Sequence, residues 1–461
     1  MKLYLTISTF IGVFLEGLFV TLHPFSGFSF DLKPGILIIL MNSIILLLSG
    51  RIWIKLWQIL LFIYLATTSY FLMAGYESLF IKQLVLITVF IIYFYNFIRY
   101  VGAEIVFNMY VKSAYYYSIF ALLYYFAEIW FGMPYFNFMP SQISAIANGS
   151  LHGLMAEQSV YCILMMPALY YSAVNRNQFG LKVPIFIFVT IILTGSAMGI
   201  VGIILSLLFL LRVPFRVAAT IILILFILIV SFLFTKKDVN GLQINPKQTI
   251  HYCFSNCSEN KEQQFNHHPY IHFGFANPTK PIEWSNEVAI IKKDIDKILE
   301  DRILLSFKSF KNEWLPDVNV DNVSSYTLIS NLLVAKKVIG NSPILGGGLG
   351  SHPINYDRYI LTIDGAGPWI RGNVILGRLD ANSLGTRIIS ELGLMGLIFI
   401  SLFFLKTYKG IDENNLRLVY SIYIYLILVL IRSGTYGSLD LFLFIFILYF
   451  STIEKITKNE K

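Results

Sequence analysis

Residues 417–453 read RLVYSIYIYLILVLIRSGTYGSLDLFLFIFILYFSTI, in which two apolar runs, 417–432 and 438–453, flank a short turn. A helix needs about 17–25 predominantly apolar residues to cross the roughly 30 Å hydrocarbon core of a bilayer. The two runs come close to that length, and the short turn brings the second run back beside the first. The stretch therefore predicts a pair of neighbouring antiparallel membrane helices.

Similar apolar runs recur along the chain, and together they predict an all-α polytopic membrane protein with about twelve transmembrane helices. The short runs near residues 35, 183 and 197 fit tilted, extended or partly re-entrant helices. The first run begins like a signal peptide, but it contains Glu16 and has no small-residue cleavage pattern, so we expect a retained helix. Besides 417–432 and 438–453, the predicted runs are 4–22, 35–49, 56–74, 82–98, 113–131, 157–174, 183–196, 197–211, 215–234 and 389–405.

The composition agrees with a surface that faces lipid. Of the 461 residues, 56% are hydrophobic and 13% are charged, and the mean hydropathy is +0.67. Soluble domains carry about 25% charged residues, so the composition excludes an ordinary soluble enzyme. The net charge of +8 comes mostly from residues between the apolar runs, where basic residues set membrane orientation, and we therefore expect no nucleic-acid partner.

Loops on alternate sides of the twelve runs differ in their content of Lys and Arg. One side holds fifteen, whereas the other side, outside one long segment, holds only Lys33, Lys82 and Arg432. Cytoplasmic loops carry the basic excess in membrane proteins. The asymmetry predicts a multi-pass protein with both termini in the cytoplasm and with the loop 132–156, which has no Lys or Arg, outside.

The long segment is polar and divides the chain into three parts. Residues 1–234 hold membrane helices 1–9, 235–388 form an extracytoplasmic loop domain, and 389–461 hold helices 10–12. The loop domain contains 17 basic and 15 acidic residues. Its first part, to about Pro281, is rich in Asn, Gln, His and Pro and predicts irregular structure. Helical spacing and end signals predict an amphipathic helix over 286–310 and a second helix over 324–339.

A glycine cluster follows this second helix in the sequence ILGGGLGSH. Glycine permits backbone N–H groups to converge on one anion, which is one way in which proteins hold phosphate. The cluster also fits a tight loop between two helices. The sequence has neither a GxxxxGK[ST] loop nor a dinucleotide fingerprint, so we expect a substrate that carries its own activation. The glycines are Gly346, Gly347, Gly348 and Gly350.

Arg387 and Glu391 lie four residues apart where the polar segment meets the tenth apolar run, so on a helix they share one face. Charges at this depth are costly unless they are paired or face a wet cavity. One interpretation is a structural salt bridge. The other is a guanidinium that holds a lipid diphosphate, oriented by the carboxylate.

Two stretches, GNSPILGGGLGSH at 340–352 and DANSLGTRIISELGLMG at 380–396, together resemble the signature of the O-antigen polymerase and O-antigen ligase family of bacterial membrane glycosyltransferases. LHGLMAEQS at 151–159 and LTGSAMG at 193–199 are weaker matches in the same order. The resemblance covers about 145–210 and 335–400. It implies a C-type glycosyltransferase-like plan, in which membrane helices carry a long outer loop late in the chain.

The resemblance implies an enzyme at the outer face of the bacterial cytoplasmic (inner) membrane that uses polyprenyl-diphosphate-linked glycans as donor and acceptor. The polymerase branch lengthens O-antigen, capsule or exopolysaccharide, and the ligase branch transfers glycan to a lipid A core. Cationic groups would stabilise the departing diphosphate. The family chemistry implies no cofactor and no metal. Membrane lipids, a chain-length regulator and a flippase are the further partners that it implies.

This sequence departs from the family pattern at two places. Asn382 stands where the family frequently has His, and an amide cannot act as a general base. His352, Asp380 and Glu157 are the candidates for that role, although an ordinary polar contact also explains a lone histidine. Ala197 stands where the family often has Arg. The candidates to supply the missing cation are Arg358, Arg371 and Arg378, for which solvated loop charges are the alternative.

The cysteines allow three interpretations. Cys253, Cys257, His268 and His272 approach the spacing of a zinc finger, but the stretch between them offers little apolar core. A disulfide between Cys253 and Cys257 and unpaired residues in a loop are the alternatives, and we favour the loop. Cys162 lies in an apolar run and is expected to be buried as a small hydrophobe.

We expect a polymerase rather than a ligase because Asn382 replaces His and because of the pair Arg387 and Glu391. A transporter of lipid-linked glycans is the alternative from another class of protein. Its charges should line a cavity at the membrane midplane, whereas these concentrate at the outer boundary. If Arg387 takes part in the reaction, Arg387→Ala abolishes polymer while the protein still inserts at normal levels.

Overall fold

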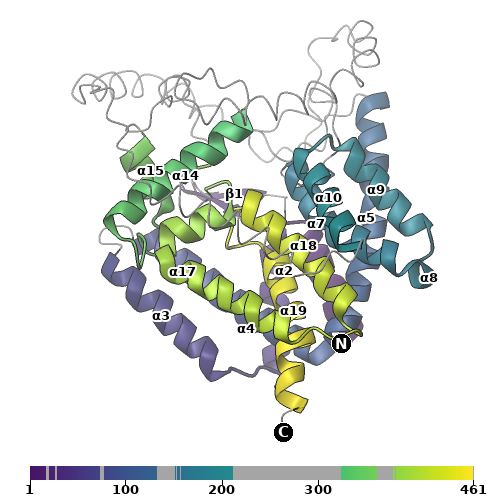
Figure 1. Ribbon diagram of the computed structural model, residues 1–461, viewed down its shortest axis with the longest axis horizontal. Helices are drawn as coiled ribbons and strands as arrows, with labels where there is room; N and C mark the ends of the chain where they lie inside the picture. The colour runs from purple at the N-terminus through teal and green to yellow at the C-terminus, as the bar shows by residue number, and fades with distance from the viewer. Residues whose placement is uncertain are drawn as a thin grey trace, which may run out of the picture.

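The computed structural model describes residues 1–16, 20–25, 28–72, 77–131, 151, 153–155, 157–210, 323–360, 377–378 and 381–459. These residues form helices and one two-stranded β-hairpin (Figure 1). The predicted span 215–234, the predicted helix over 286–310 and the polar stretch before it lie outside the described residues. Each of the other predicted apolar runs contains a helix.

The N-terminal part contains five helices whose apolar residues follow the predicted runs. Pro34 is the first residue of α2, where its missing N–H costs no helical hydrogen bond. The helices are α1 (Lys2–Phe14), α2 (Pro34–Leu48), α3 (Leu56–Leu72), α4 (Glu77–Val101) and α5 (Ala103–Phe131).

The predicted first span, 4–22, is wrong in its second half. α1 ends at Phe14, and the chain continues into two short antiparallel strands, β1 (Val20–Phe25) and β2 (Phe28–Leu32). Their β-branched and aromatic residues favour extended backbone. The pairing also satisfies backbone groups that a longer helix would have satisfied internally.

Four helices lie within the described residues 157–210. They are α7 (Gln158–Val174), α8 (Arg176–Phe179), α9 (Lys182–Leu193) and α10 (Ala197–Leu210). α9 and α10 both pack against α7. The Sγ atom of Cys162 on α7 is buried and lies 3.1 Å from Oγ1 of Thr194, so the predicted burial of this cysteine is confirmed.

The C-terminal part begins with two helices of the polar segment, α14 (Val323–Asn341) and α15 (His352–Tyr359). α14 confirms the helix predicted over 324–339. Three long helices follow, α17 (Leu384–Lys409), α18 (Leu416–Arg432) and α19 (Leu439–Asn459). Ser383 caps α17, because its Oγ accepts a hydrogen bond from the N–H of Thr386 at 3.2 Å.

Aromatic contacts join the N-terminal and C-terminal helices around one core. The ring of Phe444 on α19 lies 5.0 Å from the ring of Tyr110 on α5 and 4.2 Å from the ring of Tyr425 on α18. All three side chains are fully buried. Tilted and edge-to-face ring pairs add to the stabilisation that burial provides.

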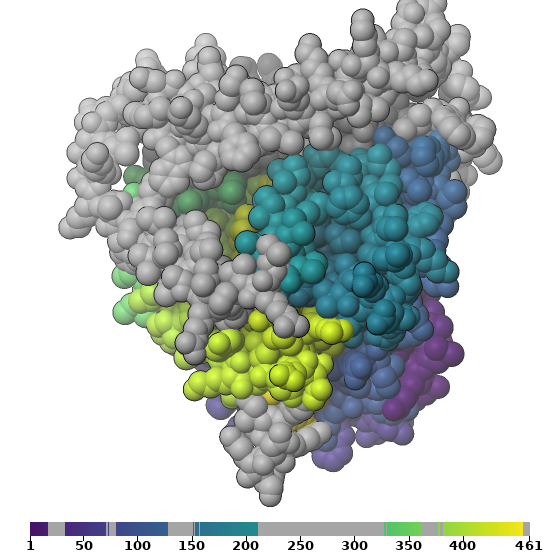
Figure 2. Space-filling model, turned by 45° about the vertical axis from the view of Figure 1, so that its right-hand side comes forward, coloured from purple at the N-terminus to yellow at the C-terminus, as the bar shows by residue number. Residues whose placement is uncertain are grey.

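Large apolar side chains also cover part of the outer surface. On α9 and α10, drawn in teal in Figure 2, exposed residues include Ile185, Phe188, Ile192, Ile204 and Leu207. Water-soluble monomers rarely expose large contiguous apolar patches. By length and composition, Phe80–Val101 in α4 and the whole of α17 are long and apolar enough to cross a membrane.

Both termini lie toward the same end of the helices, and α14 and α15 lie at the opposite end (Figure 1). The first half of α17 packs against these two helices of the polar segment. This end of the structure therefore brings together the two stretches, 340–352 and 380–396, that carry most of the predicted site.

Candidate functional site

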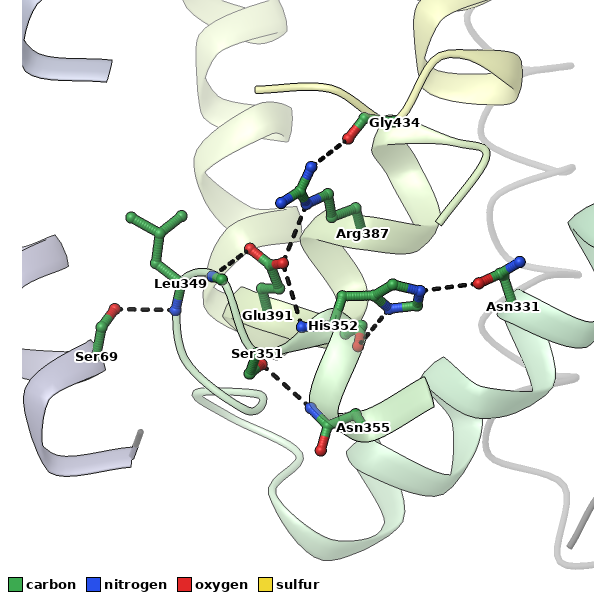
Figure 3. A network of polar contacts seen from close by, with 11 residues as sticks. Ser69, Asn331, Leu349, Ser351, His352, Asn355, Arg387, Glu391 and Gly434 are labelled. Carbon is green, nitrogen blue, oxygen red and sulfur yellow. Dashed lines mark hydrogen bonds and ion pairs between the residues drawn. The ribbon is translucent and has the colours of Figure 1, made fainter. Parts of the chain in front are cut away.

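The glycine-rich segment connects α14 to α15 and lies directly against the first half of α17 (Figure 3). The N–H of Gly347 donates to the carbonyl oxygen of Ser390 at 2.9 Å, and the N–H of Gly348 donates to that of Glu391 at 2.8 Å. In a continuous helix these two carbonyls would accept from residues 394 and 395. The loop has replaced the helix's own donors.

The replaced donors of α17 bind the same loop. The backbone of Gly393 is not helical, with φ 58° and ψ −148°. Beyond this break, the N–H of Leu394 donates to Pro343 at 3.0 Å and the N–H of Met395 donates to Ile344 at 3.1 Å. Loop and helix therefore exchange backbone hydrogen bonds in both directions, and the carbonyls of Ser390 and Glu391 and the N–H groups of Leu394 and Met395 all have a partner in the loop.

The carboxylate of Glu391 is the centre of the polar network in Figure 3. Its Oε2 accepts from the N–H of Gly350 at 2.9 Å, and its Oε1 accepts from the N–H of His352 at 3.3 Å. The side chain of Glu391 is fully buried. The backbone N–H groups of the glycine loop thus converge on an anion, and that anion is the protein's own carboxylate.

Arg387 is also buried, with 4% of its side chain exposed. Its Nε donates to Oε1 of Glu391 at 3.0 Å, so the ion pair expected from the spacing is formed. Its Nη1 donates to the carbonyl oxygen of Gly434 at 2.9 Å, and its guanidinium carbon lies 4.5 Å from the ring centre of Tyr436. A buried ion pair needs such additional contacts to offset its desolvation.

His352 is buried, and both of its ring nitrogens are engaged. Nε2 donates to Oδ1 of Asn331 at 2.8 Å, because an amide oxygen can only accept. Nδ1 therefore accepts from the hydroxyl of Ser390 at 3.2 Å. Burial, and secondly the charge of Arg387, lower the pKa of His352 to about 3. The neutral ring ties α14 to α17 and presents no open nitrogen to a substrate hydroxyl in this arrangement.

Asn382 lies just before α17 in a backbone conformation that is rare for residues other than glycine. Asn382 and its neighbour Ala381 both have φ 57°, and both are buried. The N–H of Ala381 donates to the carbonyl oxygen of Gly377 at 2.7 Å, which helps to hold the turn. Strained backbone of this kind is concentrated at functional sites.

Two of the arginines predicted to supply a cation, Arg358 and Arg378, are not part of the buried network. Arg378 forms a forked ion pair with Asp357, with 35% and 52% of the two side chains exposed. Arg358 is exposed, and its guanidinium lies over the ring of Tyr359. Arg371 lies outside the described residues, as does Asp380.

Glu157 lies apart from Glu391, at the start of α7. Its Oε2 lies 3.4 Å from Nη2 of Arg432, the last residue of α18, and accepts from the hydroxyl of Ser159 at 3.0 Å. Glu157 is 55% exposed, whereas Arg432 is 14% exposed. Of the predicted catalytic residues that the structure describes, Arg387, Glu391 and His352 form a buried group, and Glu157 belongs to a more open ion pair with Arg432.

Sequence reasoning missed several residues that complete the buried group. The hydroxyl of Ser69 on α3 accepts from the N–H of Leu349 at 2.9 Å. Ser390 stands beside Glu391 in the quoted motif and could have been included. Asn331, Ser69 and Tyr436 reach the network only through tertiary packing, and no local pattern marks them. Arg432 had a signal, because outside the long polar segment it is one of only three basic residues on its side of the predicted membrane helices.

The cysteines and histidines that approach the spacing of a zinc finger lie elsewhere in the chain. Cys253, Cys257, His268 and His272 are outside the described residues. Within the described ranges, no group of three or more His, Cys, Asp or Glu side chains is arranged to hold a metal ion.

The geometry defines a buried polar scaffold beside the more exposed ion pair of Arg432 and Glu157. The scaffold can hold the ends of α17 and α18 in fixed positions, and the open pair can contact an anionic or hydroxylic ligand. A comparison of the chain with models of protein families, with characterised proteins and with solved structures finds no match in any of the three. The function that we propose therefore rests on the residues of this chain.

Proposed function

We propose that the chain is a multi-pass glycosyltransferase of the bacterial inner membrane that polymerises polyprenyl-diphosphate-linked oligosaccharide repeat units into a surface polysaccharide. In this proposal the site faces the outer side of the membrane, and both termini lie in the cytoplasm. The donor and the acceptor are both lipid-linked glycans. The product is O-antigen, capsule or exopolysaccharide.

One observation carries the proposal. The two stretches that resemble the O-antigen polymerase and ligase family, 340–352 and 380–396, are bound to each other through the exchanged backbone hydrogen bonds and through Glu391. They are separate in sequence but share one network in space. Such a shared network is what a common site requires of these stretches.

The distribution of apolar and charged residues supports a membrane location. α17 carries the buried pair of Arg387 and Glu391 near its start and exposed apolar side chains, including Ile398, Leu402 and Leu405, further along. Exposed leucine and isoleucine are favourable in lipid, and buried charges near a helix end are tolerated when they are paired. This pattern fits a helix that enters the bilayer below the polar network.

The chemistry requires no nucleotide, because the donor carries its own leaving group. The oxygen of an acceptor hydroxyl forms a bond to the donor's anomeric carbon as the bond from that carbon to the diphosphate oxygen breaks. The electron pair of the broken bond leaves with the polyprenyl diphosphate, whose charge a cation stabilises. Glu157 and Asp380 are the candidates to accept the hydroxyl proton, since the ring of His352 is engaged on both sides.

The decisive experiment uses purified full-length protein in lipid nanodiscs with authentic lipid-linked repeat units and no nucleotide. A polymerase produces a ladder of oligomers on the polyprenyl carrier. The absence of oligomers with authentic substrate would contradict the proposal. In cells, loss of the protein should leave single repeat units on the surface, whereas long chains that persist unattached to lipid A core would identify a ligase.

A transporter of lipid-linked glycans is the alternative of another class. A transporter moves intact substrate across vesicles and forms no new glycosidic bond. Oligomer formation by the purified protein excludes transport as the sole function. Movement of a labelled lipid-linked repeat unit across protein-containing vesicles, without any oligomers, would establish the alternative instead.

A further inference from the structure

Arg432 at the end of α18 is a partly exposed cation close to the buried network. Its Nη2 lies 3.4 Å from Oε2 of Glu157, which is long for a charged hydrogen bond. The same carboxylate oxygen also accepts from Ser159 at 3.0 Å. The Nη1 atom of Arg432 is shielded from solvent and has no hydrogen-bond acceptor among the described residues. Arg432 is thus held loosely, and part of its donor capacity is unused.

Arg387 is buried more deeply and makes shorter polar contacts. Its Nε donates to Glu391, its Nη1 donates to Gly434, and its guanidinium lies over Tyr436. Its side chain is 4% exposed, compared with 14% for Arg432. A guanidinium with these partners cannot contact a diphosphate unless the buried network is taken apart.

The two arginines belong to one small region of the structure. Arg387 binds the carbonyl of Gly434, two residues after Arg432 in the turn between α18 and α19. The hydroxyl of Ser383, the cap of α17, donates to the carbonyl oxygen of Leu430 at 2.7 Å. Arg387 therefore fixes the turn that carries Arg432, and changes at Arg387 are transmitted to Arg432.

The position of Arg432 in the sequence is also unusual. Basic residues are scarce on the side of the membrane that we assign to the outside, where Arg432 is one of three beyond the polar segment. A cation at a helix C-terminus is favourable for the helix dipole, and that is the simpler explanation. It does not explain why the guanidinium lies 3.4 Å from a carboxylate that is itself 55% exposed.

We propose that Arg432 contacts the diphosphate of the lipid-linked substrate and that Arg387 is a positioning residue, which holds the turn from which Arg432 reaches out. This inference rests on the proposed function. On binding, diphosphate oxygens take the place of the Glu157 carboxylate on the guanidinium. The forked donor geometry of arginine suits this exchange, since it can bind two oxygens of one phosphate at once.

The test measures binding of undecaprenyl diphosphate to the purified full-length protein in nanodiscs. Arg432→Gln should weaken binding at least about tenfold, and Arg432→Lys should weaken it less, because it keeps the charge but loses the fork. Glu157→Gln should tighten binding, because the competing carboxylate is removed. Arg417→Gln is the matched control. Arg417 lies at the other end of α18, is exposed, and bonds to Asn175, so its loss should leave affinity unchanged.

Several results would overturn the inference. One is undiminished affinity in Arg432→Gln with an unchanged melting temperature, and another is equal weakening by Glu157→Gln, which would make the ion pair structural. Parallel measurements with inorganic diphosphate and with phosphatidylglycerol identify the source of the phosphate. If Arg432→Gln weakens phosphatidylglycerol equally, or affects only inorganic diphosphate, the contact is not specific to a lipid-linked diphosphate and the inference is wrong.

The outcome for Arg432 is separable from the outcome for polymerisation. If diphosphate binding depends on Arg432 but the protein forms no oligomers, the proposed polymerase activity is contradicted and the role of Arg432 in binding is supported. If Arg432→Gln forms oligomers normally, the polymerase activity is supported and the role of Arg432 in binding is contradicted.

Discussion

Gly346 and Gly393 lie backbone against backbone. A Cβ atom on Gly346 would come within 2.6 Å of the nitrogen of Gly393, and a Cβ atom on Gly393 would come within 2.6 Å of the nitrogen of Gly346. Both residues also have positive φ, at 65° and 58°. The exchange of hydrogen bonds between the loop and α17 is therefore possible only with glycine at both positions.

Substituting either glycine should disrupt this contact. We expect Gly346→Ala and Gly393→Ala to lower the free energy of unfolding by more than about 2 kcal/mol, because the nearest atoms are backbone and cannot move aside cheaply. Thermal melting in detergent measures the effect. Gly340→Ala is the control, since no atom lies within 4 Å of its added Cβ, and it should be neutral or stabilising. Equal melting temperatures for all three variants would contradict the role of the glycine contact.

Removing one partner of the buried ion pair should be costly. We expect Arg387→Ala or Glu391→Ala to destabilise the protein by about 3–5 kcal/mol, because each leaves a buried charge without its partner. Arg378→Ala, at an exposed pair with Asp357, should cost at most about 1 kcal/mol. The double variant Arg387→Met, Glu391→Leu should cost less than the two single changes together. Wild-type stability of Arg387→Ala would contradict this prediction. It would favour the other interpretation of the sequence, in which Arg387 holds the lipid diphosphate.

His352 should make stability depend on pH. Its pKa is about 3 in the folded protein and about 6.5 in an unfolded chain, so between these values only the unfolded chain takes up the proton. Stability therefore falls as the pH is lowered, by about 2 kcal/mol at pH 5 relative to neutral pH. His352→Gln cannot titrate, and its melting temperature should fall less between pH 7.5 and pH 5 than that of the wild type. Parallel losses in both proteins would show that another group is responsible.

The exposed face of α17 offers a test of the membrane location. Leu402 is 55% exposed on α17, and Ile344 is 59% exposed in the loop between α14 and α15. In lipid, Leu402→Asp should cost about 3 kcal/mol and reduce the amount of protein recovered from membranes. Ile344→Asp should have little effect, since the polar segment faces water in our proposal. If both aspartates are tolerated equally, α17 does not face lipid at Leu402.

Much of the helical fold could be predicted, because apolar runs and end signals are local features. The helix at 323–341 and the pairing of Arg387 with Glu391 follow from spacing alone. The hairpin that replaces the end of the first predicted span could not be predicted from its apolar composition, which suits a helix or a strand.

The sequence predicted which residues form the site better than it predicted how they are arranged. The glycine cluster and Glu391 were both recognised, but the anion that the cluster binds is Glu391 itself. The break at Gly393 arises because loop and helix exchange donors, a contact between residues about fifty positions apart. Arg387 was expected to face substrate, and its burial against Gly434 and Tyr436 depends on a turn that no local pattern links to it.

The order of Glu391 and its hydrogen-bond partners along the chain has a consequence for biosynthesis. Gly350, His352 and Arg387 all precede Glu391 in the chain, so the ribosome makes these three hydrogen-bond donors before it makes the carboxylate that accepts from them. The acid can be neutralised as α17 leaves the translocation machinery, without waiting for the last two helices. Gly434 and Tyr436, which both contact Arg387, are made later, and these contacts attach the turn between α18 and α19 to a charge pair that can already have formed.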